Sequence, residues 1–306
     1  MRYTVNMDTE SHLFHDTVTG DVVLSAPKRL YRPNNAKKSK SSDPFSSEHL
    51  KRERILATYR TGVDRITAIE NAFPVFSPNA GVRGYQEILV EGTMQRPFVQ
   101  FSVTQITNVL RAYVDRSNAV RRMKWLKAMI VFKNEGPAAG ASQMHAHSQL
   151  FGLSFVPERW KDINRRRWLA ERRHGITSHA LAISEASSPR TVYSDRHVTA
   201  YAHPAARFPY EVRILTRRKI DNVTQTTSAE LTSLARALQT CLAFVRLRAF
   251  AYNFFFHDVF ADTHEHFELR FVPRVNVWGG FELDAGIAVN PVTAEQAAEE
   301  YRQANR

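Results

Sequence analysis

The sequence predicts an α+β fold built from two similar halves. Three segments begin with a helix-capping pattern, in which Ser or Thr is followed three residues later by Gln or Glu. These patterns start at Ser102, Thr227 and Thr293, and the first two open apolar-periodic runs that reach about residues 120 and 247. Strand-like runs lie before and after both long helices, which is typical of an α+β chain. The expected strands are residues 21–25, 87–91, 129–132, 210–215, 253–257 and 266–271.

The two halves follow the same order of elements. Each runs strand, long helix, strand and then His-x-His, at His145–His147 in the first half and at His264–His266 in the second. A separation of about 120 residues is too long for a solenoid repeat and indicates a duplicated domain. We expect two tandem domains, residues 1–165 and 166–306. In an extended segment, residues i and i+2 face the same side, so each histidine pair can reach one site.

Composition and charge narrow the class of protein. Hydrophobic residues make up 43% of the chain and the net charge is +12. The sequence contains no membrane-spanning apolar run, no signal-peptide core and a single cysteine, so we expect a cytoplasmic protein. Much of the positive charge lies in residues 36–44, which predict a loop, and in residues 164–175, which predict a basic helix. We interpret this charge as a solvated or phosphate-steering surface rather than a polynucleotide site, because no nucleic-acid-binding motif accompanies it.

The residues most suited to chemistry lie in Phe-Lys-Asn-Glu-Gly-Pro-Ala-Ala-Gly-Ala-Ser-Gln-Met-His-Ala-His-Ser-Gln, at 132–149. Gly136 and Gly140 allow the backbone to approach a phosphate closely. Ser142 offers a hydroxyl donor, and Asn134 can form a hydrogen bond with a ligand. The combination predicts a phosphate-binding loop.

Two imidazoles and an amide follow this loop at alternate positions, His145, His147 and Gln149. A neutral imidazole is a good nucleophile toward phosphorus and a good leaving group afterwards. The amide of Gln149 can stabilise phosphoryl oxygens without competing for the proton. The other interpretation is a pair of core or surface histidines beside a Gly/Ala loop, but the combination favours a catalytic site.

This segment resembles the active-site signature of the galactose-1-phosphate uridylyltransferase-like branch of the histidine-triad superfamily, whose relatives include ADP-glucose phosphorylases and diadenosine polyphosphate phosphorylases. The resemblance implies a histidine-triad-like fold in each half, with a mainly antiparallel sheet and a long packed helix. It implies that His147 attacks the α-phosphorus and forms a nucleotidyl-histidine. It places Ser142 and Gln149 on the phosphate and Asn134 near the substrate. We expect His145 to orient the loop or to form a hydrogen bond with the phosphate. Gln149 stands where hydrolase branches carry a third histidine, which implies a transferase or phosphorylase.

Further substrate contacts are implied by weaker matches along the chain. Residues 26–33 are similar to a motif whose two arginines grip the nucleotide phosphates, which gives Arg29 and Arg32. Asn71 matches an asparagine that contacts the nucleoside. Glu282 lies in a stretch that resembles the family's sugar-contacting segment. Gln86 replaces a histidine of the family pattern, so this chain is a divergent member.

The resemblance also allows a prediction about the structural zinc site of the family. Where many bacterial members hold a structural zinc, this chain has Asp43, Ser46 and Gln95 beside His145, a poor ligand set, so we expect no zinc there.

A second family metal site matches His257, His264 and His266, with Asp162 or Glu158 as the carboxylate. Three histidines and a carboxylate would suit one iron or zinc ion. A hydrogen-bonded histidine cluster without metal is the alternative.

The expected function is transfer of a nucleoside monophosphate between sugar 1-phosphates through His147. The expected partners are therefore a nucleotide sugar and a sugar 1-phosphate. A phosphorylase that acts on nucleotide sugars or dinucleoside polyphosphates, with inorganic phosphate as acceptor, would use the same residues. A nucleotide- or RNA-binding protein without activity is the third alternative. The resemblance alone implies a homodimer.

Overall fold

The computed structural model describes residues 12–26, 43–62, 64–76, 83–186, 189–262 and 264–306. Its helices are α1 (Ser47–Leu50), α2 (Val103–Arg121), α3 (Glu158–His174), α4 (Ser178–Glu185), α5 (Ser228–Leu247), α6 (Gly280–Ala285) and α7 (Ala294–Gln303). Its strands in the first half are β1 (His12–His15), β2 (Val22–Ser25), β3 (Ile55–Thr61), β4 (Asp64–Glu70), β5 (Gly84–Glu91), β6 (Ala128–Glu135) and β7 (His147–Leu153). The second half contributes β8 (Thr191–Ser194), β9 (Val198–Ala202), β10 (Val212–Thr216), β11 (Tyr252–Val259) and β12 (Glu268–Pro273).

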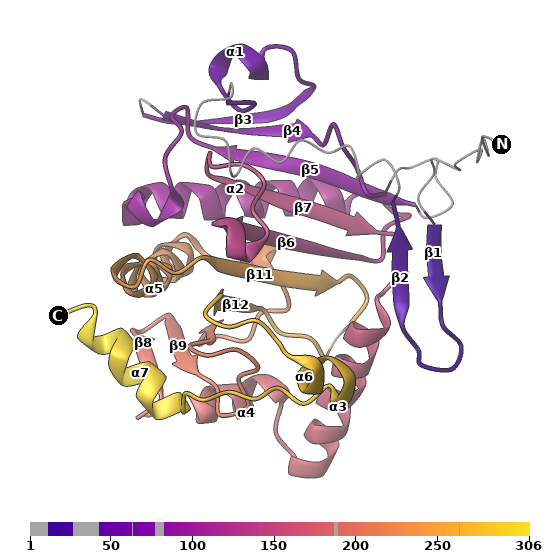
Figure 1. The fold of residues 1–306 in the computed structure, drawn as a ribbon, viewed down its shortest axis with the longest axis vertical. Coiled ribbons are helices and arrows are strands. Elements are labelled where there is room, and N and C mark those ends of the chain that lie inside the picture. Colours follow the sequence, from indigo (N-terminus) through magenta and orange to yellow (C-terminus); the bar gives the residue numbers. More distant parts are fainter. Residues whose placement is uncertain (1–11, 27–42, 63, 77–82, 187–188, 263) are drawn as a thin grey trace.

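A single antiparallel sheet runs through the molecule (Figure 1). Its ten strands lie in the order β3-β4-β5-β7-β6-β11-β12-β10-β9-β8, and β1 and β2 form a separate hairpin. Counted from either edge, the strands follow the same order, so β7 in the first half corresponds to β12 in the second. The long helices correspond as well, because α2 joins β5 to β6 and α5 joins β10 to β11.

The halves meet in the middle of the sheet, where β6 pairs with β11 along the whole length of both strands. The expected α+β fold with antiparallel sheets and a long helix in each half is therefore confirmed. The expected boundary at residues 165 and 166 falls inside α3. Because one sheet joins both halves, the division into two domains stays a prediction.

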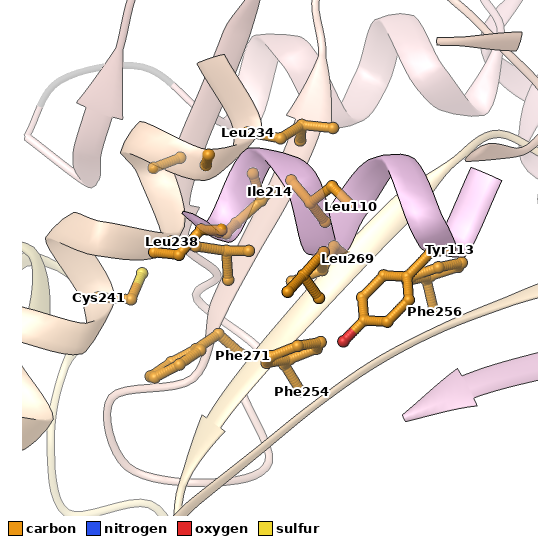
Figure 2. Close-up of a cluster of buried hydrophobic side chains, with 14 of the residues drawn as sticks. Leu110, Tyr113, Ile214, Leu234, Leu238, Cys241, Phe254, Phe256, Leu269 and Phe271 are labelled. Atoms are coloured by element: carbon orange, nitrogen blue, oxygen red, sulfur yellow. The ribbon is translucent and has the colours of Figure 1, made fainter. Parts of the chain in front are cut away.

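The main core lies between one face of this sheet and the two long helices (Figure 2). Leu110 and Tyr113 from α2 pack with Leu238 from α5 and with Phe254 and Phe271 from the central strands. Side chains alternate between the two faces of a strand, so the intervening residues point to the opposite face. That second face, which α2 and α5 leave uncovered, carries the polar residues of interest.

Capping and burial explain why the helices form where they do. Ser102, Thr227 and Thr293 each cap the backbone of the residue three positions later, and that residue's side chain bonds back to the cap, as the sequence predicted. The basic segment forms most of α3, which was also predicted. The sequence did not single out β3, β4, β8 or β9. None of the described helices is long and apolar enough to cross a membrane.

Candidate active site

The glycine-rich loop between β6 and β7 adopts a backbone that requires glycine. Gly136 and Gly140 have φ values of 84° and 79°, in the left-handed region that side chains disfavour. A Cβ on Gly136 would lie 2.8 Å from the Cβ of Ala251. Asn253 on β11 ties the loop down, because its amide donates to Asn134 Oδ1 at 2.8 Å and to the Ala139 carbonyl at 2.9 Å.

His147 is the first residue of β7 and is buried, with 6% of its surface exposed. Its Nδ1 lies 2.8 Å from the carbonyl oxygen of His145. A carbonyl can only accept, so Nδ1 carries the proton, and in the neutral ring the lone pair is on Nε2. The Phe45 ring packs against the imidazole at 5.1 Å between centroids. The fold therefore fixes both the tautomer and the orientation of the ring.

A cavity of about 320 Å³ opens beside His147 on the uncovered face of the sheet. Four residues that the sequence predicted for the site line it together: Asn71, Ser142, His147 and Gln149. Its remaining walls are Pro44, Phe45, His49, Glu53, Ile69, Glu70, Ala72, Phe73, Ile88 and Gln143. This combination of a buried imidazole, three predicted polar side chains and partly apolar walls is typical of a small-ligand site.

Asn71 is held in this wall by its neighbours. Its Oδ1 accepts from the Phe73 backbone N–H at 3.0 Å, and its Nδ2 lies 3.4 Å from Gln86 Oε1. Gln86 Oε1 also accepts from the Val75 N–H at 2.9 Å. Gln86, which replaces a histidine of the family pattern, therefore shapes the segment that carries Asn71.

His145 serves the site indirectly, because its ring does not line the His147 cavity. Its Nδ1 lies 2.8 Å from Asp43 Oδ2 and its Nε2 lies 3.1 Å from the Gly92 carbonyl oxygen. Both ring nitrogens are thus held by oxygen atoms, and the backbone carbonyl of the same residue meets His147. Two positions that the resemblance assigned to zinc in other members, Asp43 and His145, contact each other directly here.

A buried charged network lies behind β7, on the core side of the sheet. Lys133 Nζ donates to Glu91 Oε2 and, at 3.0 Å, to the carbonyl oxygen of His147, and neither charged side chain is exposed. Tyr113 donates to Glu91 Oε1 at 2.7 Å, and Ser148 also donates to this carboxylate. Burial, together with the Glu91 carboxylate, raises the pKa of Tyr113 and keeps its hydroxyl a donor. The sequence analysis missed this network, although a Lys on a strand between apolar residues was a signal for it.

The other predicted substrate residues lie elsewhere. Asn134 and Gly136 line a neighbouring cavity of about 350 Å³ together with His145, and Gln143 lies between the two cavities. Glu282 does not line the His147 cavity, and its carboxylate accepts from the Gly279 N–H at the start of α6. Arg29 and Arg32 lie outside the described residues.

Of the residues matched to the second metal site, only His257 and His266 line one cavity, and His264 and Asp162 do not line it. His257 stacks on Trp160 at 4.4 Å, and its Nε2 lies 3.0 Å from Glu265 Oε1. His264 turns instead toward α3, where its Nδ1 lies 2.9 Å from Glu171 Oε2.

His266 and Asp162 have other partners again. His266 Nδ1 lies 3.2 Å from Ser178 Oγ, and burial lowers the pKa of this imidazole to about 3, which keeps it neutral. Asp162 accepts from Arg165 at 3.0 Å and from Arg166 at 2.8 Å. No group of three or more His, Cys, Asp or Glu side chains in the described part of the chain could hold a metal ion. These four residues therefore do not fit a common metal site, and bound metal stays a prediction.

Comparison with known proteins places this fold and site in one class. Residues 64–157, from β4 to the end of the β7 loop, match the family described as galactose-1-phosphate uridyl transferase, N-terminal domain. That segment contains His147, Gln149, Ser142 and Asn71. This match confirms the resemblance to galactose-1-phosphate uridylyltransferases that the sequence predicted.

Two curated relatives and two solved structures define the similarity further. The chain is 25% identical to an ADP-glucose phosphorylase of Arabidopsis thaliana, over 94% of this chain and 91% of the relative. It is 27% identical to a galactose-1-phosphate uridylyltransferase of Thermotoga maritima, over 65% and 67% of the two chains. The fold is similar to that of an Arabidopsis thaliana ADP-glucose phosphorylase crystallised with ADP-glucose, with a TM-score of 0.79, 24% identity and coverage of 96% and 99%. A uridylyltransferase structure gives a TM-score of 0.81 at 23% identity, with coverage of 95% and 98%.

Proposed function

We propose that the protein transfers a nucleoside monophosphate between sugar 1-phosphates through a covalent nucleotidyl-histidine at His147. The observation that carries this proposal is the hydrogen bond from His147 Nδ1–H to the His145 carbonyl, which puts the lone pair on Nε2. The cavity beside the ring, the polar side chains that line it and the similarity to uridylyltransferases support the same chemistry.

The reaction consists of two successive displacements at the same phosphorus. Nε2 attacks the α-phosphorus of a nucleotide sugar, an N–P bond forms, and the bond to the bridging oxygen breaks, so that the sugar 1-phosphate leaves. A second sugar 1-phosphate then attacks the same phosphorus through a phosphate oxygen and releases the imidazole. Gln149 and Ser142 donate hydrogen bonds to the phosphoryl oxygens, and catalysis otherwise depends on positioning.

A phosphorylase is the second candidate, because one relative with similarity along most of the chain is an ADP-glucose phosphorylase. That similarity covers 94% of this chain at 25% identity, and the similarity to a uridylyltransferase of Cryptococcus neoformans covers 98% at 24% identity, so the relatives support both reactions. The first half-reaction would be the same, and inorganic phosphate would attack the adduct in the second half. Loaded protein should therefore be mixed with phosphate or with a sugar 1-phosphate, and the acceptor that discharges the adduct faster identifies the reaction.

The non-catalytic alternative, a nucleotide- or RNA-binding protein, has a separate test. Such a protein would form no adduct, and its affinity for RNA would fall steeply with salt concentration. Persistent labelling of the protein by a nucleotide sugar excludes it.

We further propose that the enzyme acts as a cytoplasmic homodimer. Large apolar side chains are exposed around α6, where Val277 is 94%, Leu283 70% and Phe281 57% exposed. An apolar patch of this kind is typical of an interface. Glu282 lies in the same segment, so a partner copy could bring it to a sugar. Light scattering of the wild type and of Leu283→Glu tests this proposal, because the variant should shift the mass toward the monomer.

A further inference from the structure

A second cavity, of about 340 Å³, lies on the same uncovered face of the sheet, in the second half of the chain. It is built on β11 and β12 and is closed by the start of α3. Because the strand order repeats, β12 occupies the position in the second half that β7 occupies in the first. His266 precedes β12 much as His147 opens β7, and His266 lines this cavity. This cavity therefore corresponds, in the second half, to the His147 cavity of the first half.

The wall contains the carboxylates Glu211, Glu265 and Glu268, but two of its arginines form no ion pair with them among the described residues. Arg159, in the first turn of α3, and Arg207 form no side-chain hydrogen bond or ion pair within the residues that the structure describes. By contrast, Arg270 in the same wall donates to Glu268 at 2.6 Å. Arg159 is exposed and Arg207 is half-buried, so both guanidinium groups are open to a ligand in the cavity. Guanidinium groups without a carboxylate partner favour the binding of an anion.

Aromatic rings make the remaining walls flat. The Arg207 guanidinium lies 4.6 Å from the centre of the Trp278 ring, and that ring stacks on Phe208 at 5.0 Å. Trp160 lines the opposite part of the cavity, stacked on His257. Flat aromatic walls of this kind favour a sugar ring or a base over a bare inorganic ion.

Buried polar atoms in the wall lack partners among the described residues. They include Nε2 of His266, a residue with only 5% of its surface exposed, and the indole Nε1–H of Trp278. A buried donor or acceptor without a hydrogen bond lowers the stability of the protein. A ligand with hydroxyl groups or heteroatoms would supply the missing hydrogen bonds. The required ligand thus combines a phosphate with polar groups on a ring.

We propose that this cavity is a second binding site, for a small phosphate monoester such as a sugar phosphate or a nucleoside monophosphate. Its phosphate contacts Arg159 and Arg207, and its ring lies beside Trp160 and faces His266. The site binds and does not react, because the neighbours of His266 differ from those of His147. The binding itself does not depend on the proposed transferase activity, and only the labelling readout below rests on it.

Calorimetric titration tests the proposal with three probes: inorganic phosphate, glucose 1-phosphate and AMP. The full-length wild type is compared with Arg159→Gln, with Arg207→Gln and with the control Arg166→Gln, which changes an exposed arginine on the same helix. We expect each cavity variant to weaken the binding of phosphate monoesters at the second site roughly tenfold or more, because a charge-assisted hydrogen bond is lost. The control should bind as the wild type does. The monoester that binds more tightly distinguishes the sugar phosphate from the nucleotide.

Labelling of His147 by a nucleotide sugar provides the second readout. Both cavity variants should label at the wild-type rate, which also shows that they are folded. Unchanged affinity for all three probes in Arg159→Gln and Arg207→Gln overturns the second site. Loss of labelling in parallel with loss of binding also overturns it, because the arginines would then belong to the His147 site.

Discussion

Replacing Lys133 by Met should destabilise the protein strongly, because it leaves a buried carboxylate without its counter-charge. Neither Lys133 nor Glu91 exposes any of its side chain, and they contact each other directly. Removing one partner of such a pair costs about 3–5 kcal/mol of folding free energy. For a chain of this size, that loss lowers the melting temperature by roughly 5–8 °C.

Urea unfolding of matched variants measures this cost. Lys133→Met should lose about 3–5 kcal/mol. Lys133→Met/Glu91→Gln should recover much of the loss, since it removes both charges and keeps an acceptor for Tyr113 and Ser148. The control is Arg54→Met, which breaks an exposed pair with Glu70 and should cost less than about 1 kcal/mol. Lys133→Met should also slow labelling of His147, because Lys133 holds the backbone carbonyl of that residue. If Lys133→Met lowers the folding free energy by no more than Arg54→Met does, the buried Lys133–Glu91 pair does not stabilise the strand that carries His147.

Two further predictions concern the loop and the histidine that positions the nucleophile. Gly136→Ala should destabilise the protein by more than Gly140→Ala in thermal unfolding, because only the first adds a clash, 2.8 Å from the Ala251 Cβ, to the strain of a positive φ; equal effects would remove the role of close packing. Asp43→Ala should slow labelling about tenfold to a hundredfold at unchanged substrate affinity, because His145 loses the carboxylate that orients it; in single-turnover kinetics, a change in affinity alone would assign Asp43 to substrate binding instead.

Local patterns account for the parts of the fold that the sequence predicted. The long helices were predictable because Ser102 and Thr227 form capping boxes before apolar-periodic runs, a signal that depends only on neighbouring residues. The edge strands β3 and β8 were not, because their pairing depends on partners far along the chain. The repeat of the two histidine pairs predicted the duplication, but not that one sheet would join the halves.

The residues of the candidate site also fall into those that the sequence predicted and those that it did not. His147, Gln149 and Ser142 were predictable, since the loop and the imidazole pair lie within one short segment. Asp43 and Glu91 were not, because each becomes relevant only when it meets residues that are distant in the sequence. The metal prediction relied on matched histidines, whose contacts in the described structure are glutamates and a serine, and it stays a prediction.

The measurement that tests the account most directly is the intact mass of the protein after incubation with nucleotide sugars carrying uridine, adenosine, guanosine or thymidine. We predict that one of them adds a single nucleoside monophosphate, with a bond that is labile in acid and stable in alkali, as a phosphoramidate is. His147→Ala should form no adduct, and His145→Ala should form it more slowly. An adduct that persists in His147→Ala, or that maps to another residue, would contradict the assignment of His147 as the nucleophile.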